Sequence, residues 1–416
     1  MAAYSVTTAG AAFAFTTSSL YYTNIFSVDT NHFFSFNIDF NGSSRANILA
    51  VNTSTWAITT ANSYLELAGS NNIAACAIKI DTNHFLTLRS NYINTSNSNG
   101  YAQVLTVNTS TWAITTASTA LNYNSAIYRR SAMCLIDANH VIAGTPGFDN
   151  TTGHDRTFFN CFAINTSSWA VSTASTEFKH TDNEFNSGVF SILKINDTHI
   201  LSIFYSPLIA QVLAVNTSTW AITTAANYCY IGDGSTSGAA SAYLIDSNHV
   251  IIFFSGTDTD GFAQVYTINT STWAITTAGS ALEFDTQDCV YDSVSCYQVD
   301  TNHFINFWTG YQEDGFVQTF AVNTSTWAIT TAGSALEFDT QYANRNKCIK
   351  IDTSHFLNEW YGYATGNALG TLQVFYVEPA PIGPVNLKTY NTNLKANIKS
   401  INTNVIANCK SLNTNV

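Results

Sequence analysis

The chain has little charge: only 10% of its 416 residues are Asp, Glu, Lys or Arg, and Asn, Thr and Ser supply most of its polarity. Such an uncharged composition, rich in β-branched and turn-forming residues, favours strands and tight turns over helices. No run approaches eighteen consecutive apolar residues, so we expect no spanning helix and no membrane insertion. No two of the eight cysteines have CxxC spacing, which argues against a structural zinc site.

Acidic residues are missing from the C-terminal end. None follows Glu378, whereas four of the fifteen basic residues do, which leaves eleven basic against twenty-seven acidic residues, or −16, for the preceding body. A body this acidic is a poor nucleic-acid binder, so no nucleic-acid partner is predicted. The N-terminal stretch MAAYSVTTAGAAFAF has no basic region before its apolar part and does not resemble a secretory signal.

Two phrases repeat along the chain and set its architecture. The phrase NTSTWAITTA, written NTSSWAVSTA at its third occurrence, starts at Asn52, Asn108, Asn165, Asn216, Asn269 and Asn323. A phrase of the type DTNHF contributes His32, His84, His140, His199, His249, His303 and His355. The period of about 50 residues is typical of propellers and solenoids.

One repeat unit, residues 73–121, contains four β-patterned runs, each ended by turn residues. They are IAACAIKI, HFLTLRS, YAQVLTV and WAITTASTAL. The turn DTN joins the first two runs and NTST the last two, and Asn, Asp, Ser and Thr suit such turns because their side chains bond to nearby backbone. Four antiparallel strands per repeat predict a propeller blade.

The two phrases differ in number, seven histidine copies against six of the other, because the last unit lacks its fourth strand. The run 369–377 matches a third strand and is followed at once by EPAPIGP, whereas residues 4–9, YSVTTA, match WAITTA. We therefore predict an all-β, seven-bladed β-propeller of four-stranded blades spanning residues 1–378, in which the N-terminal strand completes blade seven. Closure of this kind pairs strand edges that would otherwise be open to aggregation.

Beyond the propeller we expect a Pro-containing linker at 379–389 and a short C-terminal extension at 390–416. The extension repeats with a period of eleven residues: YNTNLKANIKS, INTNVIANCKS, LNTNV. The spacing of its apolar residues is also that of a right-handed helical supercoil, but Asn and Thr are poor helix formers. It is too short to bury a core alone. We expect attachment or self-association through residues 385–416.

The blade pattern sorts the turns onto two faces. The repeated DTNH and NTST turns lie on one face, and the connections that vary between repeats lie on the other. Variable loops on a rigid scaffold are where recognition usually occurs. We call these the constant face and the variable face, and expect function on the variable face.

Two repeated residue types, the histidines and the tryptophans, are candidates for a site. The seven histidines could be imagined as metal ligands, but one per blade places them far apart, so we expect Asp and His to bond within their own turn. The six repeated tryptophans are expected to pack between blades. No metal site and no cofactor is predicted.

The candidate ligand-binding residues lie in the last two repeats, near the two tryptophans that fall outside the repeated phrase. They are Trp308, Tyr311, Glu313, Asp314, Trp360, Tyr361 and Tyr363. Aromatic rings beside polar groups at a loop rim suit sugar stacking. The alternative is that the tryptophans fill the core between blades, which we favour for them but not for the tyrosines.

Catalytic signatures are weak. Glu283 and Asp285 recur as Glu337 and Asp339 in the next repeat, which indicates copied scaffold rather than a unique acid–base pair. The six arginines are scattered over several blades, whereas a sialidase-type site would need them clustered. No nucleophilic triad signature is present.

The repeat resembles the roughly 50-residue propeller repeats of tailed-phage and metagenomic surface proteins, in which Asp-x-x-[HK]-[FV] alternates with G-x-A-Q-V-L-x-V. The matching runs are 81–85 with 100–107, and 246–250 with 261–268. The eleven-residue tail likewise resembles C-terminal extensions of phage virion proteins. The chain lacks the paired glycines of kelch repeats and the Gly-His and Trp-Asp signatures of WD40 repeats.

This resemblance implies a non-enzymatic virion or tail-associated structural protein on an extracellular particle surface. Its partners would be other virion proteins or copies of itself, and a host-surface glycan or protein bound by the variable face. The alternatives are a propeller-type carbohydrate-active enzyme, either a glycoside hydrolase or a lyase, and a purely structural decoration or filament subunit.

Overall fold

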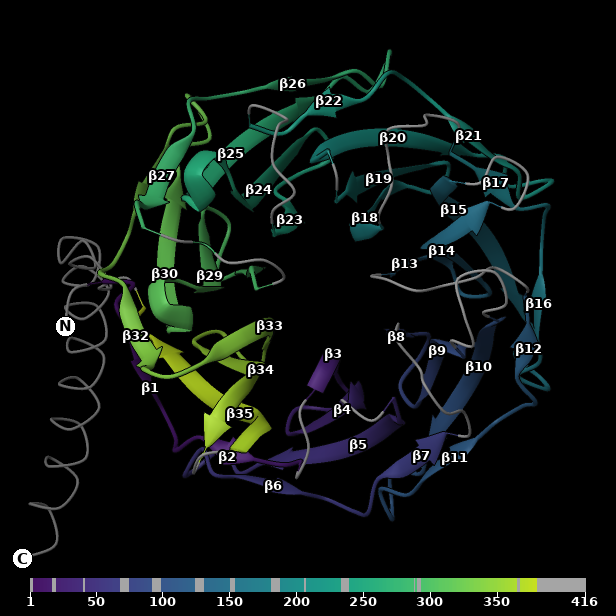
Figure 1. The fold of residues 1–416 in the computed structure, drawn as a ribbon, viewed down its shortest axis with the longest axis horizontal. Helices are drawn as coiled ribbons and strands as arrows, with labels where there is room; N and C mark the ends of the chain where they lie inside the picture. The colour runs from purple at the N-terminus through teal and green to yellow at the C-terminus, as the bar shows by residue number, and fades with distance from the viewer. Residues whose placement is uncertain are drawn as a thin grey trace, which may run out of the picture. The chain divides into compact units, whose positions relative to one another are not determined.

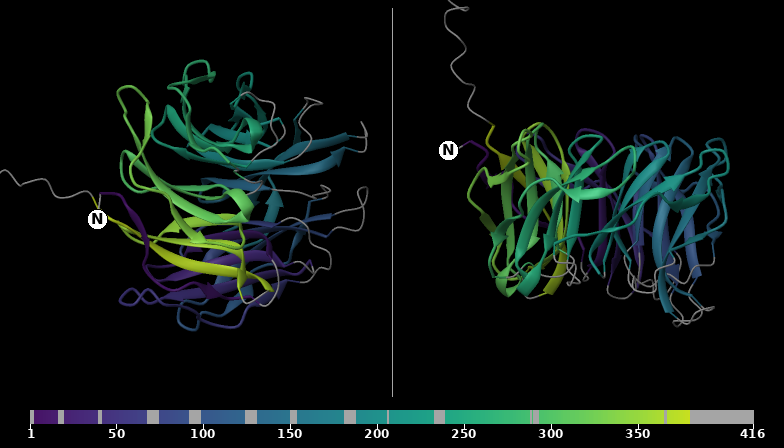
Figure 2. Two further views of the ribbon diagram at one scale, coloured as in Figure 1. Left: turned by 60° about the vertical axis from the view of Figure 1, so that its left-hand side comes forward. Right: turned by 90° about the horizontal axis from the view of Figure 1, so that it is seen from above.

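The computed structural model confirms an all-β propeller of seven blades around a common centre (Figure 1). It describes residues 3–16, 20–39, 42–67, 75–91, 99–123, 131–149, 154–180, 188–205, 207–232, 239–287, 289, 293–364 and 367–379. Seen from the side, the blades form a flat disc whose strands run between its two faces (Figure 2).

The first three blades follow one another along the chain. Blade one comprises β3 (Leu20–Ser27), β4 (His32–Asp39), β5 (Ser44–Val51), β6 (Ile58–Thr60) and β7 (Leu65–Leu67). Blade two comprises β8 (Ala75–Lys79), β9 (His84–Asn91), β10 (Asn99–Val107), β11 (Ile114–Thr116) and β12 (Leu121–Asn122). Blade three comprises β13 (Ala132–Asp137), β14 (His140–Asp149), β15 (His154–Ile164), β16 (Val171–Thr173) and β17 (Phe178–Lys179).

The next three blades repeat this order, two of them with a short 3-10 turn. Blade four comprises β18 (Val189–Asn196), β19 (His199–Phe204), β20 (Ile209–Val215), β21 (Ile222–Thr224) and β22 (Cys229–Tyr230). Blade five comprises β23 (Ala240–Leu244), β24 (His249–Ser255), η1 (Thr257–Thr259), β25 (Gly261–Ile268), β26 (Ile275–Thr277) and β27 (Leu282–Asp285). Blade six comprises β28 (Ser295–Gln298), β29 (His303–Thr309), η2 (Tyr311–Glu313), β30 (Gly315–Val322), β31 (Ile329–Thr331) and β32 (Leu336–Asp339).

Blade seven is assembled from both ends of the propeller, as predicted. It comprises β33 (Ala343–Lys350), β34 (His355–Ala364), β35 (Asn367–Val377), and from the N-terminus β1 (Val6–Thr8) and β2 (Phe13–Ala14). β1 pairs antiparallel with β35 so that Val6 lies opposite Val377, and Phe13 of β2 lies opposite Leu372. These pairs close the ring and leave no bare third strand at the junction.

The fourth strand of every blade is interrupted into two short segments, both of which pair with the third strand. A glutamine of the third strand secures the bend in five blades: Gln103 donates from Nε2 to the Ser118 carbonyl at 2.7 Å, and Gln318 does the same to Gly333. We call this residue of the third strand, five positions before the NTST asparagine, the clamp position. The clamp lets the outer strand follow the twist of the blade.

The constant face is held by a ring of stacked aromatic pairs. In each blade the repeat histidine stacks on the Trp, or in one case Tyr, of the neighbouring blade, with ring centroids 3.5–3.7 Å apart. The seventh partner is Tyr4, whose ring stacks on His303 and whose hydroxyl donates to Asp300 at 2.8 Å. The structural interpretation of both phrases is confirmed, and Tyr4 takes the place of the missing seventh tryptophan.

In six of the seven turns an aspartate orients the histidine, and in blade four Asn196 takes its place. Asp29 accepts from the Asn31 and His32 amides at 2.9 and 2.7 Å, and lies 3.0 Å from Nδ1 of His32. Burial by itself would raise the pKa of Asp29, but these hydrogen bonds outweigh it and the pKa is lowered. The six tryptophans and Tyr4 all have φ between 57° and 61°, a left-handed conformation that is uncommon for bulky residues. They therefore belong to the turn, and the strand starts two residues later.

The core lies between neighbouring blades. Each of seven buried apolar clusters draws residues from two or more successive blades, such as Phe36 of blade one with Phe85 of blade two. A blade is therefore apolar on both faces and is stable only inside the ring.

Contacts divide the chain into two units, Met1–Glu378 and Pro379–Val416. The predicted tail at 390–416 lies outside the described residues, so its role in attachment or self-association stays a prediction. Within the part of the chain that the structure describes, no helix has the length and apolar character needed to cross a membrane.

Candidate active site on the rim of blades six and seven

The loop between the second and third strands of blade six brings two candidate carboxylates to the variable face. It starts at Gly310, whose amide donates to the Asp314 carbonyl at 2.8 Å, and it contains η2. Gln312 and Glu313 have φ of 58° and 69°, a left-handed pair that side chains rarely adopt. A Cβ atom on Gly310 would lie 2.7 Å from the ring of Phe316, so only glycine fits the start of this loop.

Both carboxyl groups on this loop are less acidic than usual. Burial raises the pKa of Glu313, although the side chain remains exposed at the surface. Burial also raises the pKa of Asp314, and the negative charge of Asp339 raises it further. A carboxyl whose pKa is raised toward the working pH is better suited to proton transfer than an unperturbed one.

The two tryptophans among the candidates belong to the core. Trp308 and Trp360 are only 2% and 1% exposed, and their indole nitrogens donate to Asp285 at 2.6 Å and Asp339 at 2.9 Å. Each bond links one blade to the next. The structure therefore supports the core alternative over ligand contact for these residues, and it gives the duplicated aspartates the scaffold role predicted for them.

The tyrosines lie closer to the surface. Tyr311 is 50% exposed on the η2 loop, whereas Tyr361 in β34 is partly buried. The side chain of Tyr363 lies outside the described residues. Tyr361 packs edge-on against Tyr342, with ring centroids 5.1 Å apart.

Tyr342 interacts with Tyr361, Glu313 and Arg345. Nothing in the sequence placed it among the candidate residues. Burial raises its pKa, an effect opposed by a hydrogen bond from Asn344, and the charges of Glu313 and Arg345 then act in opposite directions. Glu313 and Arg345 therefore both lie within electrostatic reach of the Tyr342 hydroxyl. Tyr342 stands in a variable connection without any motif, so only its neighbours reveal it.

Arg345 is the second residue that the sequence concealed. It sits in an irregularity of β33, between Asn344 and Lys347, with a left-handed φ of 61°. Its guanidinium donates from Nη1 to the Leu20 carbonyl of blade one at 2.7 Å and lies 5.7 Å from the centre of the Tyr22 ring. β33 and β3 are among the strands nearest the centre of the ring (Figure 1). Strained backbone of this kind persists only where surrounding contacts enforce it.

Buried polar contacts enforce this conformation. The amide of Arg345 donates to Ser293 Oγ at 2.9 Å, and Ser293 Oγ also donates to Asn344 Oδ1. Asn346 is fully buried and donates to the Ser293 and Ala343 carbonyls at 3.1 and 3.2 Å. Polar groups buried this way add specificity to a bulge, because each would cost free energy if left unpaired.

We call Glu313, Tyr342, Asn344, Arg345 and Tyr361 the rim site, because direct contacts link the last four and the charge of Glu313 acts on Tyr342. It combines a cation, a carboxyl with raised pKa and two aromatic rings on the variable face of blades six and seven. Among the described residues, no group of three or more His, Cys, Asp or Glu side chains is placed to hold a metal ion.

Comparison with known proteins supports the fold. No family model matches the chain, and no curated protein matches it. Among solved structures, a 6-phosphogluconolactonase-like protein from Bacteroides fragilis aligns at 10% identity and a TM-score of 0.55, covering 86% of this chain and 95% of its own. A second such protein, from Bacteroides uniformis, aligns at 12% identity and a TM-score of 0.55, covering 81% and 93%. The periplasmic gluconolactonase of Pseudomonas aeruginosa aligns at 9% identity and a TM-score of 0.54, covering 87% and 96%.

These findings correct the functional expectation drawn from the sequence. The similar structures are named as lactonases, and none of the three is a virion protein. The expectation of a non-enzymatic virion or tail-associated protein, and the phage resemblance behind it, is therefore not sustained. The repeated motifs behind the phage resemblance form the aromatic stacks of the constant face and the paired strands of the blades. These hold the ring together and give no information about activity.

Proposed function

We propose that this protein is a propeller-type carbohydrate-active hydrolase whose substrate is an acidic sugar in its lactone form, bound at the rim site. The observation that carries the proposal is the strained Arg345 in β33, whose amide is held by Ser293 and whose charge, like that of Glu313, acts on Tyr342. Residues with strained backbone cluster at functional sites, and they persist there because the surrounding structure stabilises the strained conformation. The fold shared with lactonases supports the choice of substrate class.

Arg345 is suited to stabilising negative charge. Guanidinium groups are always charged and present several N–H donors in one plane, which matches a carboxylate or the oxygen of a carbonyl under attack. In the proposed reaction water adds to the lactone carbonyl, and Arg345 stabilises the oxyanion that forms. The bond to the Leu20 carbonyl fixes the direction of the guanidinium beforehand.

Glu313 is the proposed acid–base group. Its ionised carboxylate takes a proton from the attacking water, and the carboxylic acid then returns that proton to the ring oxygen as the carbon–oxygen bond breaks. The product is the open-chain sugar acid, with one water consumed. The Tyr342 and Tyr361 rings would form an aromatic wall for the sugar.

The test is hydrolysis of glucono-1,5-lactone and related aldonolactones, followed by acid release in a weakly buffered solution and corrected for spontaneous opening. We expect catalysis by the natural chain. Arg345→Met should lower kcat/KM by roughly 100- to 1,000-fold, the usual loss on removing one oxyanion donor. Glu313→Gln should lower kcat by roughly 100-fold or more.

The matched control is Glu337→Gln, which removes an exposed carboxylate from the same blade and should leave the rate unchanged. Near-ultraviolet circular dichroism of each variant confirms that the ring is intact. The proposal fails if no lactone is opened faster than in buffer, or if Arg345→Met is as active as the natural chain. Release of reducing ends from oligosaccharides, with no action on lactones, would favour a glycoside hydrolase instead.

A further inference from the structure

A second feature lies on the opposite side of the ring, at the junction of blades two and three (Figure 1). It arises from a change at the clamp position. Five blades carry Gln there, whereas blades one and three carry Asn47 and Asn160. Asn160 does not repeat the glutamine contact and instead donates from Nδ2 to Glu177 Oε2 at 3.3 Å. The shorter side chain leaves space at the bend of the outer strand.

The preceding blade presents a polar group to this space. In four blades, the residue at the end of the interrupted outer strand donates its amide to a carbonyl within the first part of the third strand or just before it; these residues are Phe15, Tyr123, His180 and Ile231. His180 meets the next clamp residue, with its Nε2 2.6 Å from Gln211 Oε1. Tyr123 precedes Asn160 in the same way, but its hydroxyl has no hydrogen-bond partner. Before Asn47 the equivalent residue is Phe15, which has no hydroxyl.

Tyr123 is 8% exposed, so an unpaired hydroxyl here is costly. Its ring is fixed edge-on against Phe162, with centroids 5.0 Å apart. Ser175 stands fifteen residues after Asn160, at the position whose carbonyl receives the clamp in other blades, and its buried hydroxyl is also without a partner. Two polar groups thus lack partners at one junction.

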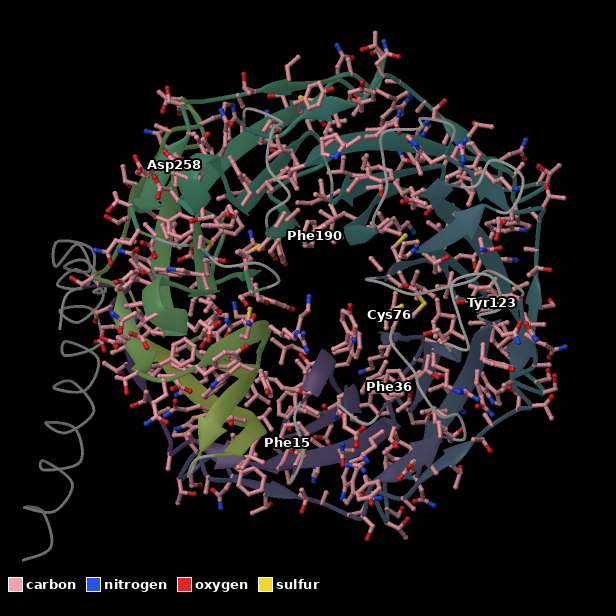
Figure 3. The ribbon with its side chains drawn as sticks, in the orientation of Figure 1. Phe15, Phe36, Cys76, Tyr123, Phe190 and Asp258 are labelled. Carbon is pink, nitrogen blue, oxygen red and sulfur yellow. The ribbon has the colours of Figure 1, made fainter. Side chains whose placement is uncertain are left out.

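Between them lies an open hollow of about 540 Å³, lined by Tyr123, Asn160, Glu177 and residues 173–176. This volume falls in the range of small-molecule sites. Figure 3 shows Tyr123 toward the outer side of the ring, while Phe190 lies near the centre. The hollow is therefore separate from the rim site.

The side chains that line the hollow indicate which class of ligand it would bind. Phenol, amide and hydroxyl groups can donate and accept, which matches sugar hydroxyls, since each of these also does both. The Glu177 carboxylate accepts from such hydroxyls and repels anions. A divalent cation is disfavoured because hard cations bind through several carboxylate or carbonyl oxygens, and Glu177 is the one carboxylate of the described lining.

We propose that the hollow between blades two and three binds a neutral sugar ring, with Tyr123 and Asn160 contacting its hydroxyls and Glu177 accepting from them. The long Asn160–Glu177 hydrogen bond is exchanged for bonds to the ligand. This is a binding site without catalysis, and it does not depend on the proposed lactonase activity. It would hold a sugar unit of a larger glycan at a distance from the rim site.

The chain itself supplies the test substitutions. Asn160→Gln introduces the clamp found in five other blades, which turns the amide toward the Ser175 carbonyl and away from the hollow, and Tyr123→Phe introduces the residue found as Phe15. Binding is measured by saturation-transfer NMR and calorimetric titration with methyl α-D-glucopyranoside, methyl α-D-mannopyranoside and methyl β-D-galactopyranoside. We expect at least one of these to bind the natural chain, tenfold or more weakening in Tyr123→Phe, and loss of binding in Asn160→Gln.

Two controls separate this site from the rest of the molecule. Gln318→Asn makes the reverse change in blade six and should leave the affinity unchanged, as should Arg345→Met at the rim site. Binding of none of the three glycosides would overturn the proposal, and so would unchanged binding in Asn160→Gln. Loss of binding in Arg345→Met would place the sugar at the rim site and overturn it as well.

Discussion

Replacement of Glu359 by glutamine should stabilise the propeller at neutral pH. Glu359 lies in β34, fully buried where blade seven meets blade one. Its carboxyl oxygens lie 3.1 and 3.0 Å from Ser35 Oγ. Burial raises its pKa from 4.5 to about 8, although the hydrogen bond from Ser35 opposes this rise. The folded protein therefore keeps this carboxyl protonated at neutral pH, whereas the unfolded chain ionises it.

The magnitude follows from linkage. Below pH 4.5 both states hold the proton and the residue makes no pH-dependent contribution. Between pH 4.5 and about 8 the folded state holds one more proton than the unfolded state, so stability falls as pH rises, by about 1.4 kcal/mol per unit. At pH 7 the accumulated loss is about 3 kcal/mol. Above pH 8 it reaches its limit.

Glutamine has nearly the same shape and cannot ionise, so Glu359→Gln should recover most of this loss at pH 7 and little at pH 4.5. The assay is urea unfolding of both proteins at half-unit steps from pH 4.5 to 9, with the difference in unfolding free energy plotted against pH. Glu283→Gln, at an exposed site in blade five, controls for the loss of a surface carboxylate. A difference that does not grow with pH would refute the argument, because it would mean that the folded and unfolded states titrate alike at this residue.

Three further outcomes are expected. Deletion of residues 1–15 should lower the midpoint of thermal unfolding sharply, because it strips β35 of both outer segments, and a peptide of residues 3–16 added in trans should restore it. Asn196→Asp should stabilise by about 0.3–1 kcal/mol at pH 7, because blade four alone has asparagine in place of the aspartate that orients the histidine; urea unfolding should show this gain disappear as pH falls through the lowered pKa of the new carboxyl. Cys76 should resist thiol labelling until the protein unfolds, because burial raises its pKa well above the usual range, whereas the partly exposed Cys229 should react before Cys76, as read by peptide mass mapping.

The rim site shows why the candidate residues were only partly predictable. Tyr311 and Glu313 could be proposed because aromatic and acidic residues stand together in one loop. Arg345 could not, because its value depends on a backbone irregularity in β33 and on contacts with blade one, more than 300 residues away. Composition also does not distinguish Trp308 from Tyr311, because their burial depends on tertiary structure: Trp308 lies in β29 and bonds to Asp285 of the neighbouring blade, whereas Tyr311 lies in the η2 turn and is exposed.

The sequence alone determined the architecture. Periodic phrases counted the blades, and the match of residues 4–9 to the fourth-strand pattern located the closing strand, because strand periodicity and turn chemistry are local properties of the chain. The tertiary structure decided how the blades are joined and where function can lie. The histidine–tryptophan stacks, the buried pair of Ser35 and Glu359 and the unpaired Tyr123 hydroxyl each depend on residues from two different blades. The number of such interfaces follows from the number of repeats. The effect of a residue that differs between repeats depends on its neighbours in the next blade, and these are known only once the ring is closed.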